Sequence, residues 1–134
     1  LTAAHSHGIK VILDLVLNHT SALHPWFQRA RWAKEGSWER DVYVWRDSSD
    51  EYKEAPVLFR NFESSNWEWD EVAGQYYLHR FLRHQPDLNY ESLWVQEQML
   101  DVVDFWLERG VDGFRLDGLI QILSEFLFNH APHQ

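Results

Sequence analysis

The sequence of 134 residues contains no cysteine, and its basic residues are few. Without cysteine, neither a disulfide framework nor a thiolate metal site can form. Lysine and arginine number 12 against 21 aspartates and glutamates, which leaves a formal net charge of -9. This acidic balance argues against a nucleic-acid-binding protein, because such proteins present a basic surface to the phosphates.

Long apolar runs are also missing. No stretch approaches the roughly 20 residues that a membrane-spanning helix needs, so we expect no membrane association. The opening residues LTAAHSHG lack the charged start and the apolar stretch of a secretory signal peptide, and we expect a cytoplasmic protein. The one methionine is Met99, so the chain has no initiator methionine and is expected to begin within a longer protein.

Aromatic residues, by contrast, are abundant. They make up 16% of the sequence and include eight tryptophans, most of which lie between Trp26 and Trp69 in a stretch without helical periodicity. Indole rings pack in protein cores, and they also stack against sugar rings. The composition therefore leaves open a carbohydrate-binding module, although such modules are usually sandwiches of many short strands.

Two apolar runs predict the central strands. Residues 9–17 (IKVILDLVL) and 111–117 (VDGFRLD) are short and rich in branched side chains, as expected of strands buried on both faces of a parallel sheet. A helix is predicted between them, after Ser92 and before Gly110, because one apolar stripe recurs at helical spacing. This alternation of strand and helix predicts an α/β fold with a parallel sheet, open or closed into a barrel.

The stretch between the two strands is irregular. Pro25 opens a predicted short helix that extends to Trp32, and residues 42–45 are compatible with a short strand. Residues 67–81 predict a β-hairpin, because two runs rich in aromatic residues flank a turn that contains Gly74.

Both predicted central strands end in polar residues. Asn18 and His19 follow the first strand, which also contains Asp14, and Arg115 and Asp117 end the second. Ligand sites of parallel α/β sheets lie at the carboxyl ends of the strands, so this coincidence is the strongest functional indication in the sequence.

The residue types at these ends are compatible with sugar chemistry. Arg115 and Asp117 are two apart on a strand and share a face, so the guanidinium can keep the carboxylate ionised. An ionised carboxylate suits a nucleophile that attacks a sugar, although a simple ion pair has the same pattern. His19 suits a donor to a substrate hydroxyl or a turn cap.

Metal ligands are harder to identify. Asn18 and Asp87 offer the hard oxygens that Ca²⁺ prefers, but such residues also form turns. Other histidines, among them His24, His79 and His84, have no partner at metal-ligand spacing in the sequence and are interpreted as structural.

Three motifs in this order resemble the α-amylase superfamily of retaining glycoside hydrolases and transglycosidases. They are DLVLNH at 14–19, QPDLN at 85–89 and GFRLD at 113–117, and the resemblance runs from about residue 3 to 117. It implies a partial (β/α)₈ barrel: residues 1–19 with the third strand, residues 20–91 as the protruding domain B insert, and residues 92–134 with the third helix, the fourth strand and a divergent tail.

The resemblance also implies roles for individual residues. Asp117 matches the catalytic nucleophile and Arg115 the arginine beside it. His19 matches a histidine that contacts the sugar, and Asp14 an aspartate that orders the site. Asn18 matches a calcium ligand, with Asp87 as a candidate second one, and no organic cofactor is implied.

Within the family, the QPDLN motif is typical of members that act on small α-glucosides. The insert most resembles that of members that interconvert maltose and trehalose by intramolecular glucosyl transfer, an isomerase activity. The alternatives are an α-glucosidase of the oligo-1,6 type and a relative that kept the barrel without the chemistry. The sequence leaves the oligomeric state open.

Two features depart from a complete enzyme. After Asp117 the run GLIQIL differs from the family pattern, in a region that helps to hold calcium in some members. The family's acid/base glutamate and second aspartate follow later barrel strands, which this chain lacks. We therefore expect the 134-residue chain to be inactive alone, and its apolar strands to lack partners.

Overall fold

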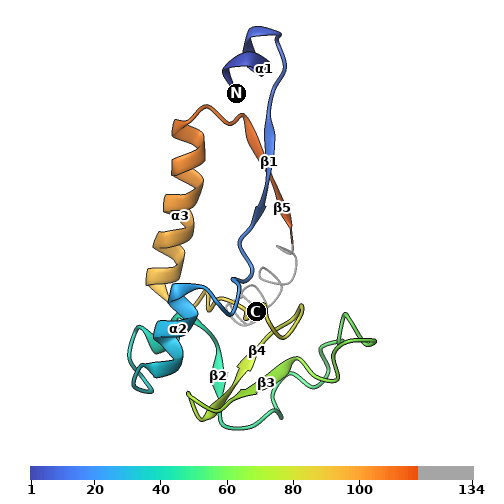
Figure 1. Ribbon diagram of the computed structural model, residues 1–134, viewed down its shortest axis with the longest axis vertical. Coiled ribbons are helices and arrows are strands. Elements are labelled where there is room, and N and C mark those ends of the chain that lie inside the picture. Colours follow the sequence, from blue (N-terminus) through green and yellow to red (C-terminus); the bar gives the residue numbers. More distant parts are fainter. Residues whose placement is uncertain (118–134) are drawn as a thin grey trace, which may run out of the picture. The chain divides into compact units, whose positions relative to one another are not determined.

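The computed structural model describes residues 1–117 and divides into two compact units (Figure 1). Leu1–Asn18 and the residues from Gln96 onward form one unit, here called the strand unit. His19–Val95 form the other, here called the insert unit. The expectations for the run after Asp117 and for the tail lie outside the described residues.

The strand unit is built on a parallel pair of strands. Strands β1 (Ile12–Val16) and β5 (Gly113–Asp117) pair in parallel, with Asp14 opposite Arg115 and Val16 opposite Asp117, and lie side by side in Figure 1. The predicted parallel pairing is confirmed. A parallel pair requires a long crossover, which the intervening sequence supplies.

Helix α1 (Thr2–Ser6) precedes β1 in the sequence, and α3 (Leu93–Glu108) precedes β5. The predicted start of α3 is confirmed, because the hydroxyl of Ser92 accepts a hydrogen bond from the backbone N–H of Val95. The chain leaves α3 through Gly110, whose φ of 95° favours glycine. Among the described residues, no helix combines the length and the apolar character needed to cross a membrane.

The prediction that both strands are buried on both faces is wrong for this chain. Ile12 is 66% exposed, Val16 49% and Leu116 42%, and only Leu15 of β1 is buried. Strand β1, which contains Ile12–Val16, is also shorter than the predicted residues 9–17. The physical reason is that the described sheet has two strands, so each has one neighbour and one open edge.

The insert unit has an antiparallel sheet of three short strands in the order β2-β4-β3. The predicted hairpin is confirmed as β3 (Trp67–Asp70) and β4 (Gln75–Leu78), and the predicted helix as α2 (Pro25–Trp32). The prediction of a strand at residues 42–45 is mostly wrong. Arg40–Val42 form a 3₁₀ turn, η1, and β2 contains only Trp45–Arg46.

Aromatic rings form the core of the insert unit. The ring centroid of Phe27 lies 5.1 Å from Tyr43, 5.6 Å from Trp45 and 5.1 Å from Tyr77. These four side chains are almost fully buried, and edge-to-face contacts add to their hydrophobic burial. Tryptophan in the insert thus serves the core in part, while three tryptophans remain exposed: Trp32, Trp38 and Trp69.

A buried arginine joins the parts of the insert unit. Arg40 is 4% exposed, and its guanidinium donates to the carbonyls of Ala33 and Ala73 and to the side-chain oxygen of Gln75. The same group lies 4.5 Å from the ring centroid of Trp45, whose indole N–H donates to the Arg40 carbonyl. The Arg40 guanidinium therefore contacts the end of α2, the hairpin turn and β2.

We expect Arg40→Met to destabilise the protein by about 3 kcal/mol, because two carbonyls and an amide oxygen lose a buried charged donor. Urea unfolding followed by tryptophan fluorescence measures this loss. The control is Arg46→Met, which removes an exposed pair with Glu51 and should cost less than about 1 kcal/mol. Equal shifts of the two unfolding midpoints would refute the central role of Arg40.

The exposed strands should make the isolated chain associate, because apolar strand faces and open edges favour intermolecular contacts. Ile12→Lys with Val16→Lys should shift the sedimentation profile toward monomer. The control pair Leu23→Lys with Val72→Lys adds the same charge at exposed positions of the insert unit and should leave association unchanged. A sharp cooperative melt of the unaltered monomer would contradict this prediction.

Candidate active site

The parallel strand pair brings two predicted site residues together. Asp14 of β1 and Arg115 of β5 are opposite in register, and a guanidinium nitrogen of Arg115 lies 3.1 Å from a carboxylate oxygen of Asp14. The parallel register explains this contact, because side chains of paired positions project to the same face. The described partner of Arg115 is Asp14, and the pairing of Arg115 with Asp117 stays a prediction.

This ion pair is too exposed to serve mainly for stability. The side chains of Arg115 and Asp14 are 69% and 61% exposed, and exposed pairs contribute about 0–1 kcal/mol. Charges that contribute so little to folding remain available to a ligand. Asp117 follows Arg115 by two residues in β5, and its predicted role as a nucleophile stays a prediction.

His19 belongs to the insert unit, where it forms an isolated antiparallel bridge with Asp87. Its imidazole centroid lies 5.0 Å from the ring of Phe81, at a tilt of 48°. The first and second motifs thus meet through their backbones. The predicted contact of His19 with a sugar stays a prediction.

The two predicted calcium ligands are both buried. Asn18, in the strand unit, is 3% exposed, and Asp87, in the insert unit, is 5% exposed. A carboxylate oxygen of Asp87 accepts a hydrogen bond of 3.2 Å from the backbone N–H of Arg80. Buried oxygen donors of these types suit a hard cation, and their ligand roles stay predictions.

Two of the histidines interpreted as structural have different surroundings. His24 caps α2, because its Nδ1 accepts a hydrogen bond of 3.0 Å from the backbone N–H of Trp26, and burial lowers its pKa. His79 is different, because Glu63 and Glu68 each bring a carboxylate oxygen near its ring. Spacing along the chain did not indicate these two partners, and the structural role predicted for His79 stays a prediction.

Part of the cluster around His79 could be found from the sequence. Within the predicted hairpin, Glu68 is opposite Tyr77, and His79 follows two residues later on the same face. Glu63 comes from the irregular segment before the hairpin, where no periodicity indicates its direction. Only the tertiary fold brings Glu63 to the other two residues.

The chain matches the alpha-amylase catalytic-domain family over residues 1–132. It therefore belongs to that family. The match extends beyond residue 117, where the resemblance in the sequence motifs was expected to end.

Among its relatives, the chain is 55% identical over 119 residues to a trehalose synthase/amylase of Mycolicibacterium smegmatis, covering 89% of the chain and 20% of the relative. It is 44% identical over 127 residues to an oligo-1,6-glucosidase of Heyndrickxia coagulans, covering 95% of the chain and 22% of the relative. The crystal structure of Bacillus licheniformis trehalose-6-phosphate hydrolase superposes with a TM-score of 0.76 at 43% identity, covering 87% and 21% of the two chains. The chain thus spans about a fifth of these relatives.

A double-mutant cycle on Asp14→Ala and Arg115→Ala should give a coupling free energy below about 1 kcal/mol that falls further at high salt. Urea unfolding of the four proteins measures it. The pair of Arg31 with the buried Asp70 is the comparison, and its coupling should be larger. If the coupling free energy of Asp14 and Arg115 were as large as that of the buried pair, the main role of the two residues would be to stabilise the fold.

Proposed function

We propose that this chain is part of a retaining enzyme that transfers glucosyl groups, of the trehalose synthase type. The observation that carries the proposal is the pairing of Asp14 with Arg115 on two parallel strands, directly before the Asp117 position. Relatives named trehalose synthase support the subgroup, since they reach 52–55% identity. The substrates would be maltose and trehalose.

In this proposal the strand unit is one piece of a (β/α)₈ barrel. β1 would be the third barrel strand, α3 the third helix and β5 the fourth strand, with the insert unit as the protruding domain. A complete barrel takes about 250 residues, so the rest would come from the longer protein. The parallel β1–β5 pair with α3 between them in sequence supports this assignment.

The first chemical step would be attack by the Asp117 carboxylate on the anomeric carbon of the non-reducing glucose of maltose. The bond between that carbon and the linking oxygen breaks, and the second glucose leaves after accepting a proton from a general acid. The result is a covalent glucosyl-enzyme. Arg115 and Asp14 would supply charges that orient the nucleophile.

The second step would re-form a glycosidic bond. The released glucose turns, and its anomeric hydroxyl attacks the glucosyl-enzyme while its proton passes to the base, which gives trehalose and frees Asp117. The acid/base carboxyl is expected in the part of the protein outside this chain. Exclusion of water would favour isomerisation over hydrolysis.

A structural Ca²⁺ is part of the proposal. The amide oxygen of Asn18 and the carboxylate of Asp87 are buried donors of the kind that Ca²⁺ prefers. Since Ca²⁺ takes six to eight oxygens, further ligands would come from other residues or water.

A hydrolase of small α-glucosides is the second candidate. The 44% identity to an oligo-1,6-glucosidase favours it specifically. A non-catalytic binding module is set aside, because the chain belongs to an enzyme-domain family and its central strands are parallel. Product analysis separates the two enzymes, since trehalose from maltose indicates isomerisation and glucose alone indicates hydrolysis.

In the longer protein, Asp117→Asn should lower kcat on maltose by at least about a thousandfold, because an amide cannot act as the nucleophile. Chromatography of trehalose and glucose provides the measurement. The control is Asp101→Asn on the exposed face of α3, which should leave kcat unchanged. Retention of activity by the Asp117 variant would refute the mechanism, and activity of the 134-residue chain alone would refute the need for an external acid/base.

A further inference from the structure

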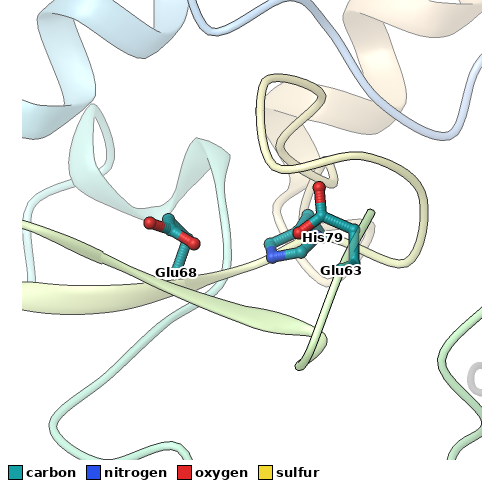
Figure 2. Close-up of side chains that lie close together, drawn as sticks. All are labelled: Glu63, Glu68 and His79. Atoms are coloured by element: carbon teal, nitrogen blue, oxygen red, sulfur yellow. The ribbon is translucent and has the colours of Figure 1, made fainter. Parts of the chain in front are cut away.

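One face of the β3–β4 hairpin carries a cluster that the glucosyl-transfer chemistry does not use. Glu68 lies in β3 opposite Tyr77 of β4, and His79 continues the ladder, with its backbone N–H bonded to the Asn66 carbonyl. Glu63, His79 and Glu68 each offer one ligand atom, and these atoms lie within 4.8 Å of one another. Figure 2 shows the three side chains, with Glu63 and His79 adjacent in this view.

The imidazole of His79 is held in a state suited to binding a cation. The ring is fully buried, and its Nδ1 lies 3.1 Å from the Phe81 carbonyl, which can only accept a hydrogen bond. Nδ1 therefore carries the proton, and in the neutral ring Nε2 keeps its lone pair. Nε2 is buried and has no hydrogen-bond partner.

A buried ring nitrogen without a hydrogen-bond partner is unfavourable, and here it belongs to a ring that lies near two carboxylates. Arg83 compensates Glu63 in part, because its Nε lies 3.3 Å from one carboxylate oxygen. No ion pair is formed by Glu68 with any described residue.

We propose that Glu63, Glu68 and His79 form a binding site for a transition-metal dication, with Zn²⁺ as its ligand. One imidazole nitrogen and two carboxylate oxygens form a set of three protein ligands that Zn²⁺ accepts, with water in the fourth position. Ca²⁺ is disfavoured, because it prefers an all-oxygen shell of six or more ligands. The backbone carbonyl that orients His79 is the outer partner that metal-bound histidines usually have.

The three ligand atoms must move closer together to hold an ion. Ligand atoms about 2.0–2.2 Å from a tetrahedral Zn²⁺ are roughly 3.4 Å apart, so atoms that lie within 4.8 Å of one another must approach by up to about 1.4 Å. Glu68 is only half-buried and can make that adjustment by a change of rotamer. Glu63 also lines an open cavity of about 410 Å³.

The ion would connect two parts of the insert unit. Glu63 belongs to the irregular segment between β2 and β3, and the other two ligands belong to the hairpin. Metal binding would therefore order that segment against β3 and β4, as metal ions do when their ligands come from separate parts of a chain.

Equilibrium dialysis of the EDTA-treated 134-residue chain against ZnCl₂ tests the proposal. We expect saturable binding of one ion per chain that excess Ca²⁺ does not displace. Glu68→Gln should weaken binding at least about tenfold, since even the loss of an outer-shell partner has that effect. The matched control, Glu71→Gln in the exposed turn of the same hairpin, should bind like the unaltered chain.

His79→Gln should remove binding, and His84→Gln, at an exposed histidine, should not. Since His79 is buried and its variant can fail to fold, the half-buried Glu68 position decides the test. Co²⁺ in place of Zn²⁺ should give visible d–d absorption that Glu68→Gln changes and Glu71→Gln leaves intact. Absence of saturable binding, or equal affinity of the Glu68 and Glu71 variants, would overturn the proposal, whether or not the longer protein transfers glucosyl groups.

Discussion

The insert unit depends on the buried guanidinium of Arg40. A buried cation is tolerated only when hydrogen bonds and nearby π-electrons replace its lost hydration, and here carbonyls, an amide oxygen and the Trp45 ring do so. The partners come from the end of α2, the hairpin turn and β4. This shared cation compensates for the small amount of regular structure between residues 19 and 95, where the strands have only two to four residues.

The strand unit depends in the same way on the register in which β1 pairs with β5. A shift of one residue would move Asp14 to the opposite face from Arg115, because side chains alternate along a strand. The register is thus a requirement of the proposed site. The same strands also carry exposed apolar residues, among them Ile12, Val16 and Leu116.

The two units use charge in different ways. Asp14 and Arg115 are exposed, which suits groups that interact with a substrate. Glu63 and His79 are buried beside the half-buried Glu68, so a bound cation would stabilise this cluster. The first arrangement supports the proposed transfer chemistry, and the second supports a metal site that would act through the conformation of the insert.

The sequence alone determined the local elements and the family. Apolar periodicity predicted α3 and the strand pair, turn residues predicted the hairpin, and three short motifs indicated the α-amylase superfamily, because each of these depends on neighbours along the chain. The tertiary structure alone decided that Arg115 contacts Asp14, that residues 40–42 turn rather than extend, and that Glu63 reaches His79. Those contacts join residues far apart in sequence or close a turn around a buried cation, and no local pattern encodes such distances.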